Sequence, residues 1–391
     1  MFLSRKKNEE VVLIVDIGND SVGASLSLLS DVATPKILYS FRSNITWHTS
    51  PENSRFVSEI SKTLEQVMKD ISQNGLRFIP RGPLGRVQIH RSHIIFSAPW
   101  YSCETKVLKV THPSPVIMTQ ELIVSLFKNE IEKFTEEAQS RARSKISQNL
   151  QVAERRVIRT KLNGYETSDP FSKKASDVEL TVFISLVSKD ILVAVQKVIN
   201  SYFHILRTDI SSFPLAAFTV FSASMPKTRD FLIVDVRGEM TDISLICDGL
   251  LMDNISFPQG KNALVRTLST GLKQSIHTSL SSLKMISQGH GGDKLLNNVF
   301  KLTETFKTVW SDSYIKSLRD VLRNKSLPQA VLLIGDVEMG IFFEDIFKQV
   351  KKGTVVHFLR KSDLHRYVHV EPAFSDTVLG LETAFVDQLA H

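Results

Sequence analysis

Two segments of the sequence place an aspartate and a glycine directly after a short apolar run. Asp16 and Gly18 follow apolar residues 11–15, and Asp235 and Gly238 follow residues 231–234. A carboxylate at the end of a strand can bind a metal ion, and the N–H groups of a glycine turn can bind a phosphate. One such hairpin is a weak signal, because Asp and Gly are common turn residues. Two of them, far apart in the chain, indicate the two halves of a duplicated fold.

The composition is that of a globular protein with a sizeable core. The chain has 391 residues, of which 42% are apolar and 23% charged, and this length allows two or three domains. The net charge of +7 is dispersed among acidic residues, so we predict no nucleic-acid partner. No apolar run reaches about 18 residues, which predicts no transmembrane segment. Cys103 and Cys247 form no metal or redox pair, and we expect reduced thiols in a cytoplasmic protein.

The spacing of apolar residues divides the chain into two strand-rich halves around a different middle section. The first half, 1–99, is predicted to hold a hairpin over 11–30, a strand over 36–45, a helix over 54–75 and a strand over 87–98. The middle section, 100–204, is predicted to hold strands at 104–111, 152–162 and 178–187 and helices that begin at Thr119 and Ser188. Pro113 and Pro115 predict a turn after the first of these strands.

The second half is expected to repeat the first. Residues 205–225 return to the first domain, and residues 226–258 with 325–375 form the core of the second. Residues 259–324 form a helical subdomain that begins with a helical region over 260–286, and residues 376–391 form a closing helix.

Three loops together resemble the phosphate and adenosine motifs of the actin/sugar-kinase/Hsp70 superfamily. They span Asp16 to Asn19, Asp235 to Asp242, and residues 334–336. The middle section, through the segment from Arg156 to Thr181, resembles the strand–helix–strand–strand (SHS2) insertion of the bacterial FtsA/PilM family. Segments at 214–217, 257–261 and 371–381 resemble the connecting elements and final helix of that family, so the resemblance extends over residues 10–390.

The resemblance implies an α/β fold in which two actin-like (ribonuclease H-like) domains carry an inserted SHS2 subdomain. Between the halves it implies a nucleotide cleft for ATP with Mg²⁺. Family members are cytoplasmic adaptors that lie at the inner face of the cell membrane through their partners. The partner is either the short cytoplasmic tail of a membrane assembly protein or a filament protein, and self-association stays open.

Within the family, a PilM-like role in type IV pilus or related secretion machinery is favoured over an FtsA-like role in cell division. FtsA-type chains continue into an amphipathic membrane helix, whereas this sequence ends at His391. An active actin-like ATPase is the third alternative. No residue is a convincing general base, so we predict no catalytic residue and weak or absent ATPase activity.

The resemblance also assigns candidate ligands. The metal ligands are Asp16 and Asp235. The cofactor-binding residues are Asp16, Gly18, Asn19, Asp20, Ser21, Asp235, Gly238, Thr241, Asp242, Gly260, Lys284 and Gly335.

Several positions depart from the family pattern. Asn19 stands where Thr or Ser is usual, and Asp336 replaces the second glycine of the adenosine loop. In the second hairpin, Arg237 and Glu239 stand where glycines let the backbone approach phosphate, and Met240 lacks a hydroxyl. These departures predict a cleft that binds nucleotide weakly or not at all.

Overall fold

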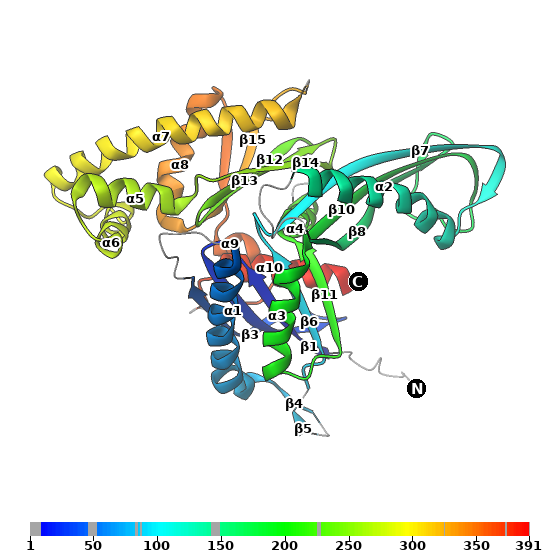
Figure 1. Ribbon diagram of the computed structural model, residues 1–391, viewed down its shortest axis with the longest axis horizontal. Helices are drawn as coiled ribbons and strands as arrows, with labels where there is room; N and C mark the ends of the chain where they lie inside the picture. The colour runs from blue at the N-terminus through cyan, green and yellow to red at the C-terminus, as the bar shows by residue number, and fades with distance from the viewer. Residues whose placement is uncertain are drawn as a thin grey trace.

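Two five-stranded sheets of the same layout carry the two hairpins (Figure 1). The computed structural model describes residues 9–45, 53–82, 85–86, 88–141, 149–224, 228–323, 325–371 and 374–390. The first sheet has the order β11-β6-β1-β2-β3, with β1 Glu9–Ile17, β2 Ser21–Ser30, β3 Lys36–Asn44, β6 Arg91–Phe96 and β11 Arg207–Ser212. The second has the order β14-β13-β12-β15-β16, with β12 Phe231–Arg237, β13 Met240–Cys247, β14 Leu250–Phe257, β15 Ala330–Gly335 and β16 Val355–Phe358.

The two sheets are equivalent strand for strand. In each, the hairpin and a third antiparallel strand lie on one side, and two parallel strands follow on the other. This confirms the predicted α/β class and the duplicated actin-like halves, which we call domain I and domain II.

Strands β1 and β12 are buried on both faces, which explains their unbroken apolar sequences. Val11, Leu13 and Val15 pack with helices α1 (Asn53–Asp70) and α3 (Lys189–Tyr202). Val12 and Ile14 point the other way, because successive side chains alternate along a strand. They lie in one core cluster with residues of α4 (Phe213–Ser224), α10 (Thr377–Ala390) and β12, so this cluster joins the two domains.

The inserted subdomain is a four-stranded sheet that extends to one side of the molecule (Figure 1). Its order is β7-β10-β8-β9, with β7 Tyr101–Ile117, β8 Leu150–Leu162, β9 Tyr165–Glu166 and β10 Lys174–Ser188. Helix α2 (Gln120–Arg141) supplies Ile123, Phe127 and Phe134 to the core of this sheet. The predicted turn at Pro113 and Pro115 is wrong, since β7 continues through both. They are tolerated because β7 is an edge strand and its pairing with β10 shifts register there.

The boundary between the inserted subdomain and domain I remains a prediction. Residues 100–204 were expected to form one unit, but α3 at its end packs against α1, with Ile191, Leu192 and Val195 in the domain I core. Ser188 caps α3 by accepting a hydrogen bond from the N–H of Ile191.

The remaining helices belong mainly to domain II. They are α5 Lys261–Leu272, α6 Ile276–Ser287, α7 Asp293–Leu322, α8 Val337–Val350 and the short α9 Lys361–Leu364. The single helical region predicted over 260–286 is divided, because Lys273 adopts a left-handed conformation with φ of 55°. The smaller elements are η1 Ile71–Gly75, η2 Leu76–Phe78, β4 Arg81–Gly82 and β5 Gly85–Arg86. Among the described helices, none is long and apolar enough to cross a membrane.

Candidate functional site

The turns of the two hairpins touch each other across the domain boundary. Asn19, in the β1–β2 turn, accepts a hydrogen bond from the N–H of Glu239 through Oδ1 at 2.7 Å, and its Nδ2 donates to the carbonyl of Ala98 at 2.9 Å. Gly238 has a φ of 47°, and a Cβ at this position would lie 2.1 Å from Asn19 Oδ1 and 2.5 Å from the Cβ of Asp20. The glycine is therefore required both by the backbone conformation and by the close approach of the other turn.

Arg237 crosses from domain II into domain I. Its Nη2 donates to Asp235 Oδ2 at 2.8 Å and to Ser97 Oγ at 2.7 Å, and its Nη1 lies 3.4 Å from Asp16 Oδ2. The guanidinium carbon lies 4.3 Å from the ring centre of Phe213, at the start of α4. A single buried cation thus bridges the two aspartates that were predicted to hold a metal ion.

Arg42, on β3, approaches Asp16 from the domain I side. Its Nη1 donates to Asp16 Oδ2 at 2.7 Å and to Ser21 Oγ at 3.1 Å, and its Nε donates to Asp376 Oδ2 at 2.7 Å. Gly23 makes room for this side chain, since a Cβ there would lie 2.7 Å from the guanidinium carbon. Two guanidinium groups therefore converge on one fully buried carboxylate.

Burial and charge pairing set the protonation of this cluster. Burial raises the pKa of Asp235, and Arg237 opposes that rise. For Asp376 the balance is reversed: burial acts to raise its pKa, but the attraction of Arg42 outweighs it and the pKa is lowered. Glu382, on α10, is fully buried, and burial and then Asp16 raise its pKa well above the usual value. Neither carboxyl oxygen of Glu382 has a hydrogen-bond partner in the described residues.

A further ion pair connects α5 to the β1–β2 turn and to Asp336, which follows β15. Lys261, the first residue of α5, lies 3.3 Å from Asp20 Oδ2 in domain I and also pairs with Asp336. Glu239 turns away from the cleft and forms a two-pronged ion pair with Arg266 on α5, with both distances 2.8 Å. Its carboxylate therefore does not face a phosphate.

Four of the other candidate ligands have structural partners of their own. Thr241 Oγ1 donates to the carbonyl of Gln259 at 2.6 Å and accepts from Trp310 Nε1 at 3.1 Å. Asp242 accepts hydrogen bonds from the Tyr101 hydroxyl and from Asn254 Nδ2, the second at 3.0 Å. Gly260 and Gly335 lie against the second hairpin, where a Cβ would come within 2.3 Å of Gly238 O and 2.9 Å of Val236 O, respectively.

The remaining candidates are divided between the cleft and the surface. Gly18 N–H donates to Ser21 O at 3.0 Å, and Gly18 O accepts from Trp100 Nε1 at 2.7 Å. Lys284 is exposed on α6, and no described contact ties it to the hairpins. The structure therefore gathers the hairpin residues in one place but does not bring Lys284 to them.

These residues do not fit Mg²⁺ and the phosphates of ATP in the arrangement seen. Mg²⁺ needs a near-octahedral set of oxygens at about 2.0–2.1 Å, but guanidinium groups lie against the carboxylates of Asp16 and Asp235. The N–H of Glu239, which could hold a phosphate oxygen, already donates to Asn19. In this part of the described chain, the buried oxygens without a partner are Asp16 Oδ1 and the two carboxyl oxygens of Glu382. The nucleotide and metal ligands remain predictions that the geometry does not favour.

Sequence reasoning missed three members of this cluster: Arg42, Asp376 and Glu382. Arg42 lies in an ordinary strand sequence, Glu382 in an ordinary helix and Asp376 just before that helix, and the contacts that matter join residues up to 334 positions apart. One sequence feature did indicate an ion pair in the cleft. Arg237 stands two residues after Asp235 where glycine is usual, and an arginine close to a buried carboxylate tends to pair with it.

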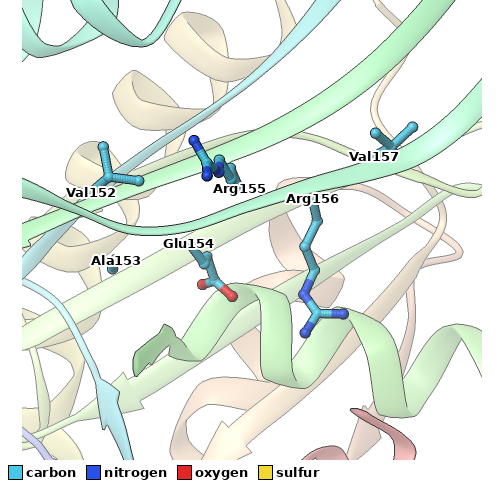
Figure 2. A pocket seen from close by; sticks show the side chains of 6 residues that line it. All are labelled: Val152, Ala153, Glu154, Arg155, Arg156 and Val157. Atoms are coloured by element: carbon cyan, nitrogen blue, oxygen red, sulfur yellow. The ribbon is translucent and has the colours of Figure 1, made fainter. Parts of the chain in front are cut away.

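A second candidate surface runs along β8 in the inserted subdomain (Figure 2). This strand pairs with β10 on one side but with β9 only at Lys161 and Leu162, so its edge is open over residues 150–159 in the described structure. Its register slips at Ala153, and Figure 2 shows Val152, Arg155 and Val157 pointing to one side. Such a bulge redirects the side chains that follow it.

The two faces of β8 have different roles. On one side, Glu154 Oε2 accepts from the N–H of Ser212 at 2.7 Å and from its hydroxyl at 2.8 Å, which ties β8 to domain I. On the other, Val152 and Arg155 line a cavity of about 670 Å³ with residues of α2, among them Val124, Lys128 and Ile131. A largely apolar groove, lined also by the basic Lys128 and Arg155 and the acidic Glu121 and Glu132, thus lies beside an open strand edge.

The two equivalent sheets, with their facing hairpins and inserted subdomain, define an actin-like α/β protein. A chain of the PilM–PilN type IV pilus biogenesis complex is 12% identical, with a TM-score of 0.62, and the match extends over 97% of this chain and 97% of that one. EutJ, an ethanolamine utilization protein from Carboxydothermus hydrogenoformans, is 11% identical, with a TM-score of 0.45 over 97% of this chain and 90% of its own. No protein-family model and no curated protein matches the sequence. At this identity the likeness to the PilM–PilN chain establishes the fold.

Proposed function

We propose that the protein is an actin-like adaptor of a membrane-associated assembly, with a PilM-like role in type IV pilus or related secretion machinery. It works in the cytoplasm and reaches the inner face of the membrane through its partner. The observation that carries the proposal is the placement of Arg42 and Arg237 on Asp16, where an ATPase of this fold needs its metal ion. The likeness to a chain of the PilM–PilN complex supports the choice of assembly.

The proposed partner is a membrane protein with a short cytoplasmic tail, which lies in extended form along β8. The open edge supplies backbone groups for strand addition, and Val124, Ile131 and Val152 supply an apolar lining. Arg155 and Lys128 line the groove together with Glu121 and Glu132, so its charges favour a tail that carries both acidic and basic residues. A filament protein and a second copy of the chain are the competing occupants.

Affinity capture from detergent-solubilised membranes, followed by peptide binding, tests this function. We expect the wild-type protein to retain a membrane protein with a short cytoplasmic tail, and a synthetic peptide of that tail to bind. Val152→Asp should weaken peptide binding by about tenfold or more, since one lost anchor is worth roughly 1.4 kcal/mol or more.

The matched control is Val309→Asp, because Val309 is a similarly exposed valine on α7 in domain II. Its peptide affinity should equal that of the wild type. Capture of a tubulin-like filament protein alone would favour the FtsA-like alternative instead.

The second candidate function is an active actin-like ATPase, which the fold alone favours. Steady hydrolysis of Mg-ATP by the purified protein, at about 1 per second as expected of a working enzyme, would establish it and displace the adaptor. We expect turnover far below that rate, because Asp16 and Asp235 already pair with arginine.

A further inference from the structure

The two domains are joined at the cleft by side chains of the protein itself. Asp16 belongs to β1 of domain I and Asp235 to β12 of domain II, and both are nearly inaccessible to solvent. Two buried carboxylates that face the same small space repel each other unless a cation lies between them. In this structure that cation is the guanidinium of Arg237.

The position of Arg237 is fixed on several sides. Its Nε donates to Asp235 Oδ1 at 2.8 Å, within its own strand, while Ser97 and Asp16 receive its Nη groups from domain I. The ring of Phe213 lies against the guanidinium on a further side. Among the described residues, every partner of Arg237 except Asp235 belongs to domain I, so this side chain connects the two domains.

Two further contacts cross the same boundary. The N–H of Glu239 donates to Asn19, and Lys261 pairs with Asp20. Arg42 takes a different part, because its partners Asp16 and Ser21 lie in domain I and its partner Asp376 directly precedes α10, which packs on the strands of domain I. Arg42 therefore holds Asp16 in place, and Arg237 connects it to domain II.

We propose that Arg237 is a built-in replacement for a divalent cation, and that it holds the two domains closed at the cleft without nucleotide. The inference goes beyond the adaptor function, since it concerns the free protein and depends on no partner. It predicts that removing the guanidinium leaves an empty cation site between Asp235 and Asp16, whose Oδ2 stays paired with Arg42 and whose Oδ1 has no described partner. The closed arrangement then requires a metal ion that the wild-type protein does not need.

Thermal unfolding of the full chain with and without MgCl2 tests the proposal. We expect Arg237→Ala to unfold at a lower temperature than the wild type and to regain part of the loss on addition of Mg²⁺. The wild type should not respond to Mg²⁺. The control is Arg266→Ala, which removes the partner of Glu239 on the same hairpin but leaves the domain boundary intact. It should not respond to Mg²⁺ either.

Hydrogen exchange of the Glu239 amide provides a second measurement, and its first part uses only the wild-type protein. Because this N–H donates across the boundary, its exchange in the wild type should be slow and unchanged by Mg²⁺ with a non-hydrolysable ATP analogue. In Arg237→Ala it should be faster by about tenfold or more, as expected when a buried ion pair is broken.

Two results would overturn the proposal. One is a wild-type protein that Mg²⁺ or Mg-nucleotide stabilises or protects at Glu239, because the cleft would then accept a ligand despite Arg237. The other is an Arg237→Ala variant that behaves as Arg266→Ala does. Neither result depends on peptide capture. The adaptor function and the proposed role of Arg237 can therefore be disproved separately.

Discussion

The backbone N–H of Glu239 donates a 2.7 Å hydrogen bond to the side chain of Asn19, so the turn of one hairpin is bonded to the turn of the other. In a cleft that binds nucleotide between two such turns, these groups are needed for phosphate. Here they bind each other, and Gly238 brings the two backbones close enough for them to do so. Asn19, which stands where the resemblance predicts Thr or Ser, therefore takes part in the contact between the two turns.

Replacing Asn19 by alanine should destabilise the protein. The change leaves the carbonyl of Ala98 and the N–H of Glu239 without their partner, and a buried polar group left unpaired costs about 1–3 kcal/mol. Urea unfolding of Asn19→Ala measures the loss. The control is Asn149→Ala, whose lost hydrogen bond to Asp190 is exposed, with an expected change within about 0.5 kcal/mol. Equal stability of the two variants would contradict the cross-boundary role of Asn19.

Gly238→Ala should cost more than the conformation of the glycine alone explains. A left-handed backbone at a non-glycine residue costs about 1–2 kcal/mol, and here the new Cβ also meets Asn19 and Asp20. Gly164→Ala is the matched control, because Gly164 has a φ of 84° and nothing lies within 4 Å of its Cβ position. The excess loss in Gly238→Ala, measured by urea unfolding, reports the contact between the turns. Equal losses would mean that the turns can separate freely.

The strands and the duplication could be predicted from the sequence because their signal is local. Residues 11–15 and 231–234 are continuous apolar runs, as expected of strands buried on both faces. Gly18 and Gly238 lie in the facing turns, and Asp16 lies near the end of β1. The likeness to the PilM–PilN chain agrees with the predicted fold.

The contacts within the cleft could not be predicted, because they depend on residues that are distant in the chain. Arg42 lies on a half-exposed strand, and its partner Asp376 precedes the final helix. No periodicity links them. Lys284 was assigned to the site by resemblance alone, and the helix that carries it presents it to solvent. Motif position thus predicted the backbone of the site better than it predicted the side-chain partners.

Variants of Thr241 test whether its hydroxyl stabilises the fold or binds nucleotide. Thr241→Val keeps the shape of the side chain but removes the donor to Gln259 and the acceptor for Trp310, which should lower stability by about 1 kcal/mol. Thr241→Ser retains the hydroxyl and should recover most of the loss. Both variants should have the same affinity for Mg-ATP as the wild type in a titration. A variant of unchanged stability with lost nucleotide affinity would restore Thr241 as a phosphate ligand.

Asp242 should make stability depend on pH between about 4 and about 7. Burial raises its pKa from 3.8 to about 7, so in this range the folded protein binds a proton at Asp242 that the unfolded chain has released. Stability from this group is therefore fully present below the unfolded pKa and falls as pH rises, by at most about 1.4 kcal/mol per pH unit, until the folded pKa is passed. Asp242→Asn has no such proton. The difference in unfolding free energy, wild type minus variant, should decrease from about pH 4 to about pH 7 and then level off.

The hydroxyl of Tyr101 allows the direction of this effect to be checked with a second variant. Its hydrogen bond to Asp242 favours the charged carboxylate and so lowers the pKa that burial has raised. Tyr101→Phe removes that bond, and the decline of stability with pH should extend to a higher pH than in the wild type. A flat difference between wild type and Asp242→Asn would mean that Asp242 stays charged throughout. The bond between β7 and β13 would then hold a carboxylate, and the inserted subdomain would be tied to domain II by a charge-assisted contact at every pH.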